Sequence, residues 1–147
     1  SHCHLSYEPM VNDIPNVLNL CAKEKINQLL TIGTNYKTSL KSIEIADNYE
    51  NIYCAIGIHP SEVDNDSHNF SALKLLIGKS KKIIGIGETG LDFHYKKSDS
   101  KNQIKNFYRH IELANLNKIP VIVHTRDAEK ETLEVISEEK KKIILAF

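Results

Sequence analysis

Two carboxylates, Glu88 and Asp92, lie in a glycine-rich stretch that follows an apolar run of the chain. The stretch, residues 85–93, reads GIGETGLDF. The apolar run predicts a buried strand, and the glycines predict a loop after it in which the backbone turns sharply. A carboxylate is costly to bury there unless a positive charge faces it. We therefore expect Glu88 at a cation site, where its two oxygens allow it to bridge two ions.

Histidines accompany these carboxylates at the start of the chain and at the ends of other apolar segments. His2 and His4 are one residue apart, so on a strand both side chains lie on the same face and can reach one metal ion. An isolated pair of this kind is a polar chain end as often as it is a metal-binding pair. The pair gains weight because His124 closes a further apolar run, and because His59 is held in an extended backbone by Pro60. Histidines and a carboxylate gathered at strand ends are typical of a hydrolytic metal site.

Other polar residues are candidates for supporting roles. His59 either binds substrate or only ends its strand, and Arg126 is a candidate for holding a phosphate oxygen. Asp92 is expected to orient a metal ligand, with capping of the next segment as the alternative. Asp127 is also assigned a supporting position beside the ligands, where it pairs with Arg126 or begins the next helix. The remaining histidines are expected to play no part, since they fall in polar loops or within a helix: His68, His94 and His110.

Expected helices and strands alternate along the chain. Helical spacing of apolar residues covers residues 12–25, 38–48, 70–78, 100–117 and 128–139, and short apolar strands cover residues 26–33, 52–58, 82–87, 120–124 and 142–147. This alternation predicts parallel βαβ units, and continuous apolar strands indicate a sheet covered on both faces. Reactive side chains close nearly every strand, which favours a (β/α)8 TIM-type barrel over an open doubly wound sheet.

The length limits how much of such a barrel the chain can hold. A complete TIM-type barrel needs roughly 250 residues, whereas this chain has 147. We therefore predict an α/β fold that is an incomplete N-terminal portion of a barrel, organised as a single domain over residues 1–147. Both ends of the sequence are expected to fall within secondary structure.

Composition narrows the class of protein. Hydrophobic residues make up 41% and charged residues 26%, as in ordinary globular domains. Nineteen basic side chains balance nineteen acidic ones, so the chain lacks the net positive charge of a typical nucleic-acid binder. Its three cysteines have no zinc-finger spacing and indicate a reducing compartment, and no apolar stretch reaches transmembrane length. We expect a cytoplasmic protein with no membrane partner.

Taken together, these motifs resemble the TatD family of metal-dependent deoxyribonucleases, within the amidohydrolase-like barrels. The matching segments stand in the family's order: residues 1–5 (SHCHL), 57–60 (GIHP), 87–92 (GETGLD) and 123–128 (VHTRDA). The resemblance implies two divalent ions, of Mg²⁺, Mn²⁺ or Zn²⁺. His2 and His4 would bind one ion, His124 the other, and Glu88 would bridge them.

The same resemblance implies a substrate and a reaction. The substrate would be DNA, and an activated water would hydrolyse its phosphodiester bonds, with removal of nucleotides from one end. His59 and Arg126 would position the phosphate. The sequence itself leaves the metal identity and the oligomeric state open.

The sequence also departs from the family pattern. The family has a further histidine, in a His-Cys-Phe context, where this chain reads Leu145-Ala146-Phe147, and a later aspartate that falls beyond residue 147. Both metal sites therefore lack one ligand within this sequence. Two alternatives stay open: a related ester or amide hydrolase, such as a D-aminoacyl-tRNA deacylase, and a metal-poor inactive fragment or binding scaffold.

Overall fold

Six parallel strands form one curved sheet in the order in which they occur along the chain. The computed structural model describes residues 2–95, 97–138 and 145–146. The strands are β1 (His2–Cys3), β2 (Leu29–Ile32), β3 (Ile52–Ile56), β4 (Ile83–Asp92), β5 (Val121–Arg126) and β6 (Leu145–Ala146). Each strand pairs with its successor in the sequence, and every pair is parallel. This sequential order is that of a (β/α) barrel, and it confirms the predicted incomplete barrel.

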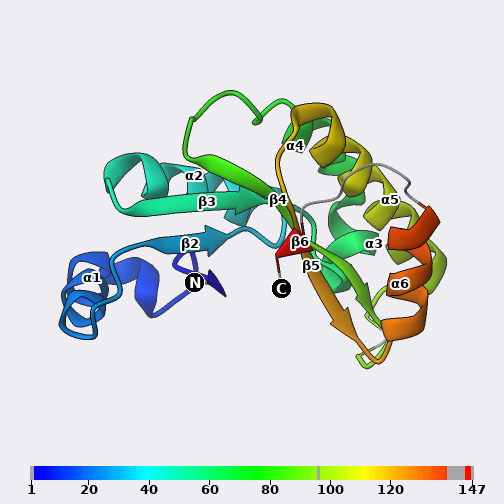
Figure 1. Cartoon of the computed structure of the whole chain (residues 1–147), viewed down its shortest axis with the longest axis horizontal. Helices are drawn as coiled ribbons and strands as arrows, with labels where there is room; N and C mark the ends of the chain where they lie inside the picture. Colours follow the sequence, from blue (N-terminus) through cyan, green and yellow to red (C-terminus); the bar gives the residue numbers. More distant parts are fainter. Residues whose placement is uncertain (1, 96, 139–144, 147) are drawn as a thin grey trace.

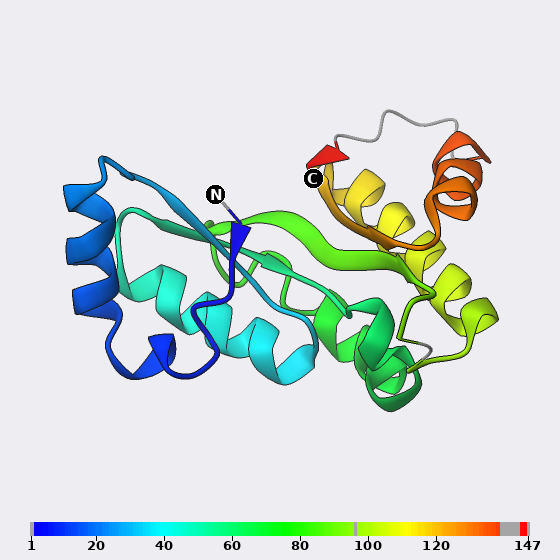
Figure 2. The same ribbon diagram turned by 90° about the horizontal axis from the view of Figure 1, so that it is seen from below.

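Helices connect the strands, as the alternation predicted. They are α1 (Ile14–Lys23), α2 (Tyr36–Asn48), α3 (Val63–Asp66), α4 (Phe70–Lys74), α5 (Ser100–Asn117) and α6 (Glu129–Glu138), with single turns at Met10–Asn12, Pro60–Glu62 and Ser67–Asn69. Figure 1 shows α1 and α2 beside the first strands, in blue and cyan, and α5 and α6 beside the last ones, in yellow and orange. The view in Figure 2 shows the curvature of the sheet. None of the described helices is long and apolar enough to cross a membrane.

The helix ends follow ordinary capping chemistry. The Asn35 side chain accepts a hydrogen bond from the backbone N–H of Thr38, whose hydroxyl in turn bonds back to Asn35, forming a capping box for α2. The Asp99 carboxylate accepts the backbone N–H groups of Lys101 and Asn102 in the first turn of α5. These caps fix where α2 and α5 begin, and both helices contribute side chains that contact the segments around the site.

The sheet is buried on both faces, as its continuous apolar strands predicted. The main core fills the space between the sheet and the helices, and its largest side chains include Phe107, Ile56 and Ile86. A second, smaller cluster of Ile32, Ala55 and Ile122 lies apart from it. Successive residues of a strand point to opposite faces, so neighbours such as Ala55 and Ile56 contribute to different clusters.

The fourth strand is longer than predicted. We expected a strand over residues 82–87 followed by a loop, but β4 continues to Asp92 and pairs with β5 up to Arg126. The glycines caused this error, because here they permit close strand packing. A Cβ atom added at Gly90 would lie 2.1 Å from the carbonyl oxygen of His124. Glu88 is consequently held within a strand, at an irregularity in its register.

Smaller differences concern the ends of other elements. The start of the chain, which was expected to fall within secondary structure but for which no strand bounds were predicted, forms β1 with His2 opposite Leu30. The helix expected over residues 70–78 is shorter, since α4 ends at Lys74. In the last expected strand, residues 145–146 form β6, whereas residues 142–144 and 147 lie outside the described part of the chain.

A buried histidine of α5 makes the stability depend on pH. His110 is fully buried, and this burial lowers its pKa from 6.5 to about 4. In the unfolded chain this histidine binds a proton below about pH 6.5, whereas in the folded protein it stays neutral down to about pH 4. The free energy of unfolding therefore has its full contribution from His110 above pH 6.5, and this contribution is lost as the pH falls toward 4. We expect about 2 kcal/mol of stability to be lost through this residue between pH 7 and pH 5. Urea unfolding at pH 7 and at pH 5 should show this difference in the free energy of unfolding. His110→Gln, which cannot titrate in this range, should lack the part of the difference that comes from His110.

Candidate metal centre

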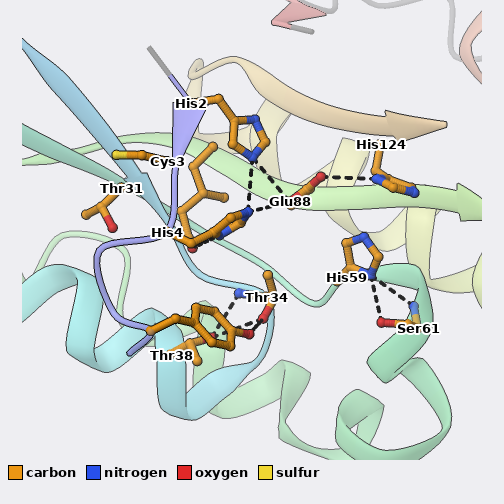
Figure 3. A network of polar contacts seen from close by, with 12 residues as sticks. His2, Cys3, His4, Thr31, Thr34, Thr38, His59, Ser61, Glu88 and His124 are labelled. Carbon is orange, nitrogen blue, oxygen red and sulfur yellow. Dashed lines mark hydrogen bonds and ion pairs between the residues drawn. The ribbon is translucent and has the colours of Figure 1, made fainter. Parts of the chain in front are cut away.

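Glu88 lies at the centre of a group of histidines from three strands. Its side chain is nearly buried, and its two oxygens face in different directions. Oε2 lies 3.4 Å from Nε2 of His2 and 3.5 Å from Nε2 of His4, while Oε1 lies 3.1 Å from Nδ1 of His124. Figure 3 shows the first two histidines on one side of the carboxylate and His124 on the other. One carboxylate thus faces two separate sets of nitrogen atoms.

The His2 and His4 side chains lie on the same side of the chain, as their spacing predicted. Cys3 between them points away, and its thiol contacts the carbonyl oxygen of Leu30 (Figure 3). Nδ1 of His4 lies 3.0 Å from the carbonyl oxygen of Ile32. A carbonyl can only accept a hydrogen bond, so Nδ1 carries the proton and Nε2 keeps a free lone pair. That lone pair faces Glu88, which is the arrangement of a metal-ligating histidine.

The spacing of these three ligand atoms fits a divalent cation. Nε2 of His2 and Nε2 of His4 are 3.3 Å apart, which closes a triangle with the two distances to Oε2 of Glu88. A metal ion with bonds of ~2.1 Å separates neighbouring ligands by about 3.0–3.4 Å, depending on its geometry. With the Nδ1 proton directed at the Ile32 carbonyl, Nε2 of His4 and Oε2 of Glu88 would both offer lone pairs to a cation placed between them.

His124 lies between two carboxylates on the other side of Glu88. Its Nδ1 contacts Glu88, and its Nε2 lies 3.2 Å from Oδ2 of Asp92. The hydrogen bond to Glu88 raises the pKa of His124 against the opposing effect of burial. Burial acts to raise the pKa of Glu88, but the hydrogen bond with His124 and the surrounding histidine charges outweigh it, so that pKa is lowered. An ion beside Glu88 would replace the Nδ1 proton, and His124 would then bind it through Nδ1 while Nε2–H donates to Asp92.

Asp92 is itself held from several directions. Its Oδ1 accepts hydrogen bonds from the backbone N–H groups of His94 and Tyr95, at 3.1 and 3.2 Å. Its backbone N–H and carbonyl bond to the side-chain amide of Gln103 in α5. Asp92 therefore occupies the position proposed from the sequence, one hydrogen bond away from a candidate ligand, and it also caps the segment that follows.

His59 approaches the same group from the end of β3. Its ring lies 4.4 Å from the ring of His124, centroid to centroid, and its ligand atom falls within 4.8 Å of those of Glu88 and His124. Burial, with the nearby His124 charge, lowers the pKa of His59 to about 4. Its Nδ1 accepts the backbone N–H of Ser61 at 3.1 Å, so the neutral ring carries its proton on Nε2. This tautomer favours donation to a substrate oxygen over metal binding.

Arg126 and Asp127 make contacts that the sequence did not indicate. The Arg126 guanidinium lies over the Tyr95 ring, 4.5 Å from its centroid. Asp127 has a left-handed backbone and its carboxylate lies 2.7 Å from Nδ1 of His94. The predicted Arg126–Asp127 pair is therefore absent from the described contacts, and so is a contact between Asp127 and a candidate ligand. The sequence predicts no part for His94, because a histidine in a polar loop carries no signal of its partner.

The end of β2 positions three site residues through its backbone. Successive carbonyl oxygens accept from Nδ1 of His4, from the N–H of Glu88 and from the N–H of His59, at 3.0, 3.1 and 2.8 Å. These carbonyls belong to Ile32, Gly33 and Thr34. Sequence reasoning missed this segment, because a backbone carbonyl is present at every residue and gives no chemical signal.

The contact between Asp92 and His124 gives a prediction. Asp92→Asn keeps the size of the side chain but lowers its capacity to hold His124 by a charged hydrogen bond. We expect the affinity for the ion beside His124 to fall ~10–100-fold, the range found for residues that orient metal ligands. Calorimetric titration with Mn²⁺ measures this change. An unchanged affinity would show that Asp92 only caps the following segment.

Comparison with known proteins assigns this chain to a family. The family model described as TatD related DNase matches residues 1–146. YabD of Bacillus subtilis strain 168, named an uncharacterized metal-dependent hydrolase, is 32% identical over 140 residues. YcfH of Escherichia coli K12, with the same description, is 35% identical over 144 residues. Each alignment covers 95% of this chain, and 54% of YabD or 53% of YcfH. The chain thus spans about half the length of these relatives.

A solved structure shares the fold. The crystal structure of YjjV, a TatD homologue from Escherichia coli K12, superposes with a TM-score of 0.88 at 22% sequence identity. The superposition covers 94% of this chain and 54% of YjjV. This likeness concerns the fold, and it agrees with the incomplete barrel that the sheet order shows.

Proposed function

Because this chain belongs to the TatD-related DNase family, we propose that the protein is a metal-dependent hydrolase that cleaves the phosphodiester bonds of DNA. The observation that carries the proposal is the position of Glu88, whose two oxygens face two different sets of histidine nitrogens. His2, His4 and Glu88 would hold one divalent ion, and His124 with Glu88 would hold the second. Ions bound there would lower the pKa of a water molecule and neutralise charge on a phosphate.

The other residues of the site would act on the substrate or on the ligands. His59 presents Nε2–H as a donor for a phosphate oxygen, since its Nδ1 is already occupied by Ser61. Arg126, supported by the Tyr95 ring, offers a guanidinium for the same anion. Asp92 keeps the His124 ring in one orientation. Glu88 itself is nearly buried, which strengthens the electrostatic contacts of its carboxylate.

Removal of the metal tests this proposal directly. The protein that contains this chain should degrade a labelled DNA oligonucleotide with Mg²⁺ or Mn²⁺ present. A chelator should stop the reaction, and excess divalent ion should restore it. DNA degradation that survives complete metal removal would contradict the proposal.

The same preparation also separates the two alternatives. A D-aminoacyl-tRNA offered under identical conditions contains an ester bond in place of a scissile phosphodiester. Ester hydrolysis without DNA hydrolysis would identify a deacylase. Absence of both activities, with no binding of Mn²⁺, would identify a scaffold.

A further inference from the structure

The segment that leads into His59 is held by side chains of α5 that lie outside the candidate metal centre. β3 ends at Ile56, so the backbone N–H and carbonyl of Ile58 lie beyond the strand and need hydrogen-bond partners from another element. Its N–H donates to Nε2 of His110 at 3.1 Å, and its carbonyl accepts from Nδ2 of Asn106 at 3.0 Å. Both backbone polar groups of Ile58, the residue before His59, are thus satisfied by one helix.

Buried residues make this contact, and its chemistry is specific. His110 is 0% and Asn106 is 1% exposed. Nδ1 of His110 lies 2.8 Å from the carbonyl oxygen of Asn106, one turn earlier in α5. A carbonyl requires a donor, so Nδ1 carries the proton and Nε2 is left as the acceptor that Ile58 needs. Only a neutral ring in this tautomer satisfies both contacts.

Asn106 also connects the two sides of the site. Its Nδ2 lies 3.5 Å from the hydroxyl oxygen of Thr89, the residue after Glu88. Its Oδ1 is buried and finds no partner among the described residues. An unpaired buried acceptor costs about 1–3 kcal/mol, and an apolar residue of similar size would avoid that cost. What such a residue would lose is the contact with Ile58 and Thr89.

We infer that Asn106 and His110 are positioning residues that orient the His59 ring toward a phosphate bound beside Glu88. They act through Ile58, whose N–H bonds to His110 and whose carbonyl accepts from Asn106, while the Thr34 carbonyl accepts from the N–H of His59 itself at 2.8 Å. The inference rests on the proposed role of His59 as a donor to substrate. It assigns a function to a histidine that the sequence left without one.

A pair of substitutions at His110 tests this assignment. His110→Gln keeps a side-chain acceptor within reach of the Ile58 N–H, whereas His110→Leu removes it at similar volume. We expect His110→Leu to weaken binding of thymidine 5′-monophosphate to the Mn²⁺-loaded protein about tenfold, and to raise KM for DNA similarly. His110→Gln should stay within about threefold of the unchanged protein. Affinity for Mn²⁺ should be the same in all three, because no ligand is altered.

A double-mutant cycle separates positioning from general packing. If His110 acts through His59, then His110→Leu should have no further effect on nucleotide binding once His59→Ala is present. An equal loss in both backgrounds would overturn the inference, and so would a His110→Gln variant as weak as His110→Leu. Should His110→Leu not fold, Asn106→Ser, which is too short to reach Ile58, enters the same cycle.

The two readouts keep this inference distinct from the proposed function. Nucleotide binding that depends on His59 and His110, without hydrolysis of DNA, would refute the nuclease and leave the positioning role standing. Hydrolysis of DNA that is insensitive to both His110 substitutions would support the nuclease and refute the positioning role.

Discussion

Replacement of Glu88 by glutamine is expected to lower the metal-dependent rate of DNA hydrolysis by ~10³-fold or more, which corresponds to about 4 kcal/mol of transition-state stabilisation. Glutamine has nearly the same shape, so the packing within β4 should be kept. It supplies one neutral carbonyl oxygen in place of two charged ones, and it cannot hold ions on both sides. The expected loss follows from the contacts of Oε1 and Oε2 with separate histidines.

A matched control isolates the role of position. Glu134→Gln makes the same chemical change at an exposed helical residue whose nearest charged partner is Lys130 at 3.9 Å. It should leave the rate within about twofold of the unchanged protein, since exposed pairs contribute little. Single-turnover rates with saturating Mg²⁺ compare the two variants. A Glu88→Gln protein with normal activity would contradict the assignment of this site.

Gly90→Ala is expected to lower the free energy of unfolding by about 3 kcal/mol or more. The backbone of Gly90 has φ +134°, where residues with a side chain are strained, and the new Cβ atom would lie 2.1 Å from the His124 carbonyl oxygen. Relief of that overlap requires β4 and β5 to separate at the point where Glu88 meets His124. Loss of activity should therefore accompany loss of stability. Urea unfolding measures the first effect and DNA hydrolysis the second.

Gly78 provides the comparison for Gly90. It also has a positive φ, +89°, but no atom lies within 4 Å of the place that its Cβ would take. Gly78→Ala should cost only about 1 kcal/mol, from backbone strain alone, and should leave activity intact. Equal costs at the two glycines would show that close packing of β4 against β5 contributes nothing.

Much of the site could be predicted from the sequence because Glu88 and His124 follow apolar runs, and because the spacing of His2 and His4 puts both on one face of a strand. The carboxyl ends of parallel strands meet at one edge of a sheet, so His2, His4, Glu88 and His124 were expected together, and the structure brings them together. The extent of β4 could not be predicted. Glycine signals both a turn and a close approach of two strands, and only the neighbouring strand decides between them.

Contacts between distant elements were also beyond the sequence. Asp127 pairs with His94, 33 residues away, and His110 meets Ile58 across 52 residues. A buried histidine in a helix resembles any other core residue until its partners are known. The three carbonyls at the end of β2 have no side-chain signal at all. These features follow from how the strands and helices pack, and residue types alone do not determine them.

The central claim is that Glu88 joins two cation sites, and electron paramagnetic resonance of the Mn²⁺-loaded protein tests it most directly. Two Mn²⁺ ions bridged by one carboxylate lie about 3.5–4 Å apart and couple magnetically. We predict that the unchanged protein binds two ions with a coupled spectrum, and that Glu88→Gln loses the coupling together with at least one ion. Two uncoupled ions in the unchanged protein, or a coupled pair that survives Glu88→Gln, would contradict the account.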